Sequence, residues 1–129
     1  MGPMSAAKRF LDEILTGNWP RPTGTRVAGL RVSLHGSLAF TGLGHGTGRA
    51  IVLGLSGWAP DEVDPDKIDA IVAAVEGSGE VHPDGHPAYR FRPAYDLLYD
   101  RKARLPGHSN GLQFFALDAD GSTLLRRVY

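Results

Sequence analysis

A glycine-rich turn between two apolar segments constrains the fold of this chain more than any other feature. The stretch from Leu34 to Gly54 reads LHGSLAFTGLGHGTGRAIVLG, with glycine at positions 42, 44 and 46. Glycine permits positive φ values and lets a ligand or another chain approach the backbone closely. His45 stands between two of these glycines, so its side chain can be held away from the preceding strand. This turn is the first candidate for a functional site.

An apolar helix is expected directly after the turn. Thr47 is a favourable N-cap for a helix that runs through about Ser56. A helix N-terminus presents unpaired N–H groups and a partial positive charge, which suit a carboxylate or a phosphate. Its apolar residues run nearly all round it, so it should be mostly buried; they are Ala50, Ile51, Val52, Leu53 and Leu55.

Two interpretations of His45 remain open. The turn can offer backbone N–H groups, the Thr47 hydroxyl and the His45 imidazole to a small anionic or zwitterionic ligand, with His45 moving protons near neutral pH. Alternatively, the glycines only permit a tight strand-to-helix connection, and His45 is a solvated loop residue. Nucleotide fingerprints do not fit, because GxGxxG fails at Thr47 and no GxxxxGK[ST] occurs.

The composition excludes several classes of protein. A chain of 129 residues suffices for one domain with a hydrophobic core. Its 14 basic and 14 acidic side chains give no basic field for nucleic acid or an anionic membrane. The absence of cysteine removes disulfides, thiol catalysis and thiolate-held clusters from this chain taken alone, and fits a reducing compartment. No apolar run approaches the roughly 20 residues of a membrane span, and no signal peptide is evident, so we expect a soluble intracellular domain.

The remaining patterns predict an α+β fold. Apolar residues at helical spacing between Ala7 and Leu15 indicate an amphipathic helix, and alternation from Arg26 to His35 indicates a half-buried strand. Asp64 and Pro65 start another helix, which should stop at Gly77 or Gly79.

Strands dominate the last third of the chain. Tyr89 to Arg92 alternates as a short strand interrupted by Pro93, after which Tyr95 to Tyr99 either continues the strand or turns. Leu112 to Leu117 and Thr123 to Val128 form a terminal β-hairpin. We expect the helices to pack on one face of a small mixed sheet.

The other histidines give weaker signals. His35 lies on the polar face of its strand and is expected at the surface, and His82 and His86 are expected to be solvated. His108, with Ser109 and Asn110, again places polar groups in a glycine turn, although an Asn-Gly turn that simply starts the hairpin explains it equally well. A zinc site built from three of the histidines is not favoured, because no HxxxH or HExxH spacing occurs.

Several stretches resemble one family in order and spacing. GSLAFTGLGHGT at Gly36 to Thr47, VDPD at Val63 to Asp66 and LPGHSNGLQF at Leu105 to Phe114 are similar to the β domain of iron–sulfur-dependent L-serine dehydratase (L-serine ammonia-lyase). MGPMSAAKRF at Met1 to Phe10 resembles that family's VGPMxAAxxF segment. The resemblance covers nearly the whole chain.

The resemblance implies a function, a cofactor and a fold. Members of this family convert L-serine to pyruvate and ammonia with a [4Fe-4S] cluster whose open iron acts as Lewis acid. By this resemblance His45 is the catalytic histidine of the domain, and the enzyme is a homodimer of the full chain. The implied fold is helices over a four-stranded mixed sheet, like the allosteric substrate-binding domain of some phosphoglycerate dehydrogenases. The implied substrate-binding residues are Ser37, Thr41, Gly44, Gly46, Thr47, His108 and Asn110.

The chain also departs from the family pattern. Relative to the family it lacks the preceding SSSHT motif, the following YSxGGGF stretch and the α domain that carries the cluster cysteines. We therefore expect an excised or separately encoded β domain, truncated at both ends and inert without its partner. The alternatives are a regulatory module that binds L-serine at residues 42–47 or 108–110, and an interaction domain whose apolar edge pairs with a second subunit.

Overall fold

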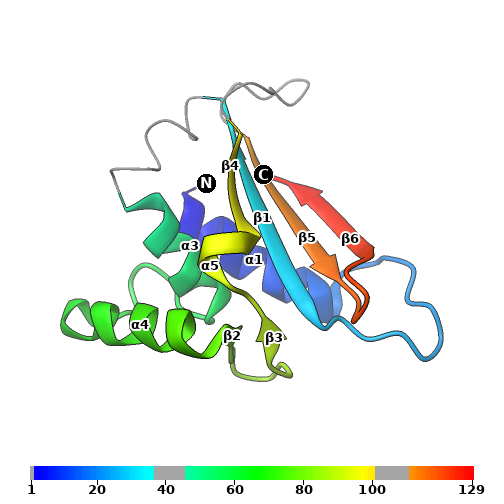
Figure 1. Ribbon diagram of the computed structural model, residues 1–129, viewed down its shortest axis with the longest axis horizontal. Coiled ribbons are helices and arrows are strands. Elements are labelled where there is room, and N and C mark those ends of the chain that lie inside the picture. Colours follow the sequence, from blue (N-terminus) through cyan, green and yellow to red (C-terminus); the bar gives the residue numbers. More distant parts are fainter. Residues whose placement is uncertain (1, 37–45, 101–110) are drawn as a thin grey trace.

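The computed structural model describes residues 2–36, 46–100 and 111–129, and shows helices packed against a mixed sheet (Figure 1). The helical elements are α1 (Pro3–Thr16), α3 (Thr47–Leu55), the 3-10 turn η1 (Pro65–Lys67), α4 (Ile68–Ser78) and the single turn α5 (Pro93–Asp96). The strands are β1 (Gly29–His35), β2 (Glu80–Val81), β3 (Tyr89–Arg90), β4 (Leu97–Asp100), β5 (Leu112–Leu117) and β6 (Thr123–Val128). The predicted α+β class is confirmed.

Strand β1 is the centre of the sheet. The strand order is β2-β3-β1-β5-β6, and β4 also pairs with β1. β5 runs antiparallel to β1, whereas β3 and β4 run parallel to it. Because Gly29 pairs with Arg90 and Val32 pairs with Leu97, β3 and β4 lie one after the other along the same side of β1. The expectation of four strands is therefore wrong in number: α5, beginning at Pro93, divides one expected strand into β3 and β4, and β2 adds a further one.

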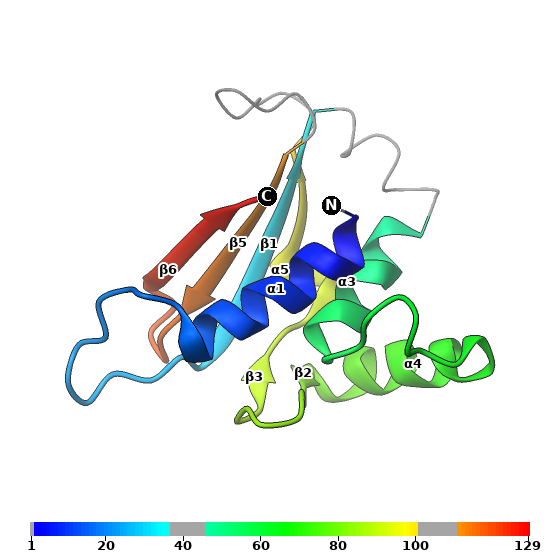
Figure 2. The same ribbon diagram turned by 180° about the vertical axis from the view of Figure 1, so that it is seen from behind.

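The core lies between the sheet and the helices α1 and α3. α1 crosses behind the sheet in Figure 1 and in front of it in Figure 2. Phe10 of α1 packs on Phe114 of β5, with ring centroids 5.3 Å apart. The two helices approach so closely that a Cβ at Gly54 would lie 2.4 Å from the carbonyl oxygen of Met4. Within the described ranges, no helix combines the length and apolar character that crossing a bilayer requires.

The structure confirms most helix boundaries and corrects one cap. α3 begins at Thr47 and its residues from Ile51 to Leu55 are buried, as predicted. The N-cap is Gly46 and not Thr47, however, because φ of 77° at this position is a left-handed conformation that favours glycine. Asp64 is a true cap, since its carboxylate accepts a hydrogen bond from the N–H of Asp66, and the expected stop at Gly79 is confirmed. The terminal hairpin has the predicted bounds.

Candidate functional site

Most of the site residues expected from the sequence lie outside the described residues. These are Ser37, Thr41, Gly44, His45, His108 and Asn110. Gly46 and Thr47 are described, and they form the start of α3. The candidate site is therefore built from the residues that flank the two predicted turns.

The flanking residues meet where neighbouring strands of the sheet begin or end. β1 and β4 run parallel and end together, with His35 in register with Asp100. The backbone N–H of His35 donates to the carbonyl of Gly111 at 2.9 Å, which places the start of β5 beside these two strand ends (Figure 1). These strand ends are therefore where segments 37–45 and 101–110 join the described structure, and the two segments carry most of the predicted site residues. The family resemblance implied substrate-binding residues in both turns, but no pattern in the sequence indicated that their flanking strands lie side by side.

No carboxylate of α3 itself neutralises the N-terminus of this helix. No acidic residue occupies its first turn and no side chain caps it. Such a terminus attracts a carboxylate or phosphate through its N–H groups and its dipole. Arg49 forms an ion pair with Asp69, which links α3 to α4. The first turn of α3 therefore keeps the anion-attracting character that the sequence predicted for it.

Tyr99 joins the end of β4 to the first turn of α3. A Cβ built at Gly48 would lie 2.8 Å from the Tyr99 hydroxyl, so the phenol reaches the helix backbone. Tyr99 packs against the hydrophobic core, and this burial raises the pKa of its hydroxyl. The side chain acts as a brace between strand and helix, which sequence reasoning did not identify.

His35 is not the surface histidine that the sequence predicted. It lies on the expected face of β1, but only 7% of its surface is exposed. Its Nε2 shares a 2.7 Å hydrogen bond with the hydroxyl of Ser33, which is equally buried. Nδ1 is buried and has no hydrogen-bond partner among the described residues. The prediction failed because β1 is the central strand, so β4 and β5 flank even its polar face.

His86 is also less solvated than expected, whereas His82 is exposed as predicted. His86 is half-buried, and its Nδ1 lies 2.7 Å from the hydroxyl of Tyr89. Burial lowers the pKa of His86, although Asp12 opposes this shift. Burial also raises the pKa of Tyr89 to about 12. The His82 side chain is 65% exposed, with Nε2 3.7 Å from a carboxylate oxygen of Glu80.

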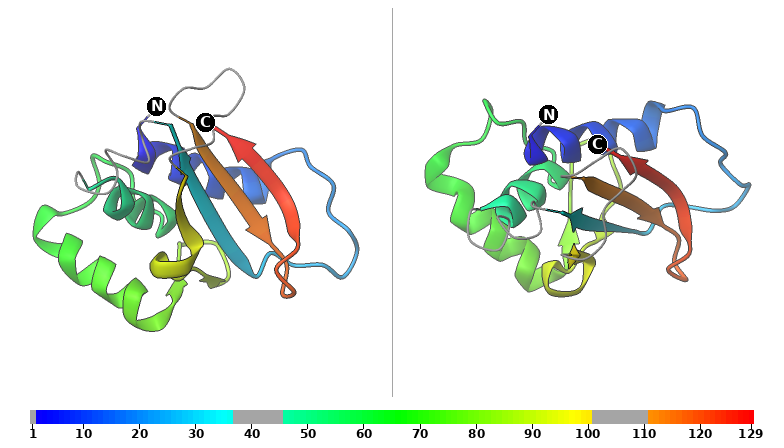
Figure 3. Two further views of the ribbon diagram at one scale, coloured as in Figure 1. Left: turned by 45° about the horizontal axis from the view of Figure 1, so that its top comes forward. Right: turned by 90° about the horizontal axis from the view of Figure 1, so that it is seen from above.

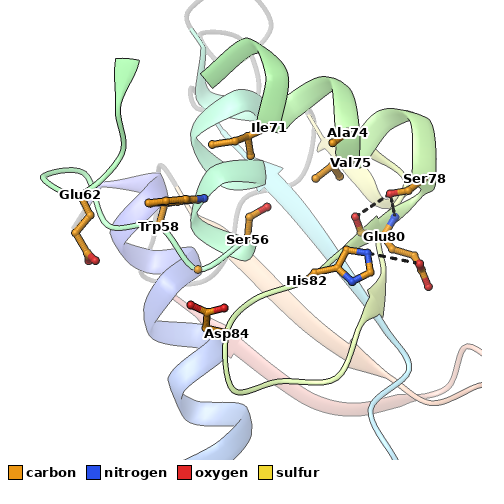
Figure 4. A pocket seen from close by; sticks show the side chains of 11 residues that line it. Ser56, Trp58, Glu62, Ile71, Ala74, Val75, Ser78, Glu80, His82 and Asp84 are labelled. Atoms are coloured by element: carbon orange, nitrogen blue, oxygen red, sulfur yellow. Dashed lines mark hydrogen bonds and ion pairs between the residues drawn. The ribbon is translucent and has the colours of Figure 1, made fainter. Parts of the chain in front are cut away.

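A hollow lies between the end of α3, α4 and the β2–β3 connection, away from the candidate site. It has a volume of about 490 Å³, and Trp58, Glu80, His82 and Asp84 are among the residues that line it (Figure 4). The carboxylates give the hollow negative character. No sequence pattern marks it, because its lining comes from separate segments of the chain. The described ranges contain no group of three or more His, Asp or Glu side chains arranged to hold a metal ion.

Comparison with known proteins gives one consistent result. The family profile of the serine dehydratase beta chain matches residues 1–129. The chain is 37% identical to an L-serine dehydratase of Streptomyces coelicolor over 134 residues, covering 100% of this chain. It is 33% identical to an L-serine dehydratase of Haemophilus influenzae and 35% identical to one of Mycobacterium tuberculosis, each over 130 residues and all of this chain. It spans 28%, 28% and 27% of the lengths of these three relatives. The chain belongs to the serine dehydratase beta chain family.

Proposed function

We propose that this chain is the β domain of an L-serine dehydratase, a lyase that converts L-serine to pyruvate and ammonia. The observation that carries the proposal is the family match, which extends over residues 1–129. The relatives named L-serine dehydratase also align with the whole of this chain.

The proposed enzyme needs a second, cysteine-bearing α domain. This chain spans 28% of the Streptomyces relative, so most of such an enzyme lies elsewhere. A [4Fe-4S] cluster is held by cysteine thiolates, and this chain has no cysteine. Its residues therefore do not fit the role of thiolate cluster ligands. We therefore assign the cluster to the α domain and derive no step at the cluster from this chain.

The proposed contribution of this chain is a histidine wall of the active site. His45 is assigned proton transfer to or from the substrate, because imidazole titrates near neutral pH. Ser37, Thr41 and Gly44 would shape the same wall, with His108 and Asn110 on the neighbouring segment. The residues that flank segments 37–45 and 101–110 meet at the ends of β1 and β4. There His35 pairs with Asp100, and its backbone N–H donates to the carbonyl of Gly111, which supports a joint site.

The start of α3 is proposed to bind the carboxylate of the substrate. L-serine carries a carboxylate, and the N-terminus of α3 at Gly46 and Thr47 has no acidic residue in its first turn. Backbone N–H groups at such a terminus bind a carboxylate without a cationic side chain. The role proposed for this turn is to orient the substrate, while His45 handles the proton.

The test is a reconstitution. Pyruvate formation from L-serine is measured for two preparations. One is the chain alone, and the other is the chain combined with the remaining domain of its native enzyme. We expect no pyruvate from the chain alone and steady turnover from the combination. Pyruvate from neither preparation, together with saturable L-serine binding by the chain alone, would instead support the regulatory module.

A further inference from the structure

The two faces of the sheet are covered unequally by the described residues. α1 and α3 cover the face that carries Leu30, Val32 and Leu34, whereas the opposite face has only the single turn α5 at its border among the described helices (Figures 2 and 3). We call this opposite face the open face. Its members alternate with the core residues along each strand, and the argument concerns Arg31, Ser33, His35, Leu98, Phe115 and Arg126.

The open face is hollowed beside the parallel pair of β1 and β4. β1 pairs in parallel with β4 over four register positions, from Val32 with Leu97 to His35 with Asp100. A mixed sheet of this kind can leave one face to solvent, so the pairing alone does not require a cover. A hollow of about 750 Å³ lies on this face, and Arg31, His35, Asp100 and Phe115 are among the residues that line it.

Exposed apolar side chains gather at the border of the open face. Tyr95 is 68% exposed and Leu98 is 44% exposed, and both lie in the short α5–β4 segment. Among the described residues, only Leu15 is a further large hydrophobic side chain with comparable exposure. Because two large apolar side chains are exposed beside the open face, we take this segment as part of a contact surface.

The open face also carries two arginines that form no ion pair with another described residue. Arg31 pairs across the sheet with Phe115, and Phe115 pairs with Arg126, so the two arginines flank one aromatic side chain. Arg49, Arg92 and Arg127 each have a carboxylate partner. In the described ranges, no carboxylate contact accompanies either Arg31 or Arg126, and the buried Nδ1 of His35 likewise lacks a partner there.

We propose that the open face is the docking surface for the remaining part of the dehydratase, which presents apolar side chains to Phe115 and Leu98 and carboxylates to Arg31 and Arg126. This inference rests on the proposed function. The occupant follows from length, because the chain spans 28% of the Streptomyces relative, and from the charge of the face. A second copy of the chain is a less suitable occupant. A two-fold contact through this face would bring Arg31 and Arg126 of one copy close to the same arginines of the other.

The test measures association of the 129-residue chain with the remaining domain of its native enzyme by titration calorimetry. Arg31→Glu and Arg126→Glu place a charge of the wrong sign on the open face. We expect each variant to weaken binding about tenfold or more, with less salt dependence than the native chain shows. Arg26→Glu is the control, because Arg26 is exposed and precedes β1. Circular dichroism and thermal melting establish that each variant is folded.

The outcomes separate docking from the proposed activity. Native-like affinity of both open-face variants, or no association of the native chain, overturns the docking surface. A native chain that sediments as a dimer, with the dimer lost in Arg31→Glu, also overturns it in favour of a second copy. If Arg31→Glu and Arg126→Glu weaken association but the native pair forms no pyruvate, the docking surface stands and the proposed reaction fails. If the native pair forms pyruvate but Arg31→Glu and Arg126→Glu bind as the native chain does, the proposed reaction stands and the docking surface fails.

Discussion

The hydroxyl of Tyr99 lies against the backbone of Gly48 in the first turn of α3. A Cβ at position 48 would come 2.8 Å from this oxygen and 3.1 Å from Cδ2 of Leu97. Glycine at position 48 therefore permits the close approach of the strand end to the helix start beside the candidate site.

This contact predicts that Gly48→Ala destabilises the fold. Alanine in a helix normally gains up to about 1 kcal/mol over glycine, but overpacking costs roughly 1–3 kcal/mol. We expect a net loss in the free energy of unfolding, measured by denaturant titration. Adding Tyr99→Phe removes the obstructing oxygen and should restore part of the loss.

Gly77→Ala in α4 is the matched control for that experiment. A Cβ at position 77 meets nothing within 4 Å, so this substitution should stabilise the chain by about 0.5–1 kcal/mol. Equal gains in stability at positions 48 and 77 would show that the Tyr99 contact does not constrain the fold.

The hydrogen bond between Ser33 and His35 predicts a non-additive pair of substitutions. Ser33→Ala leaves Nε2 of His35 buried without its 2.7 Å partner, which should cost about 1–3 kcal/mol. The double variant Ser33→Ala with His35→Phe removes both polar groups and should lose less stability than the sum of the single variants. Strict additivity in a double-mutant cycle would contradict the pairing.

Local patterns predicted much of this fold, and long-range contacts account for what they missed. Apolar spacing located α1, and a start signal at Thr47 with the apolar run after it located α3. The bounds of β5 and β6 were predicted residue by residue, because each pattern lies within one strand. The burial of His35 was missed, because it depends on β1 lying between strands that come much later in the chain. The two-residue strands β2 and β3 are too short to show a period. For the site, Gly46 and Thr47 occur at the expected helix start, and the role of His45 remains a prediction.

The burial of Tyr89 predicts that the free energy of unfolding falls at alkaline pH. Burial raises its pKa from 10.0 to about 12, so the unfolded chain loses this proton at lower pH than the folded chain does. The contribution of Tyr89 is complete below about pH 10 and falls away between about pH 10 and about pH 12, by an amount on the order of 2 kcal/mol. Denaturant unfolding across this range measures it.

Tyr89→Phe is the control for the alkaline experiment. The variant lacks the hydroxyl bonded to His86 and should be less stable at neutral pH, but its stability should decline less steeply in alkali. Burial also raises the pKa values of Tyr99 and Tyr129, so a smaller slope remains. A slope identical to that of the native chain would show that Tyr89 titrates normally.

The catalytic role of His45 is the central claim, and its most direct test is turnover of L-serine by the native enzyme carrying His45→Ala. General acid–base catalysis contributes about 10²–10⁴ in rate, so kcat should fall by at least about a hundredfold while thermal stability and cluster content stay unchanged. His82→Ala, at an exposed histidine, serves as the control and should leave kcat unaltered. A His45→Ala enzyme with native kcat would contradict the account.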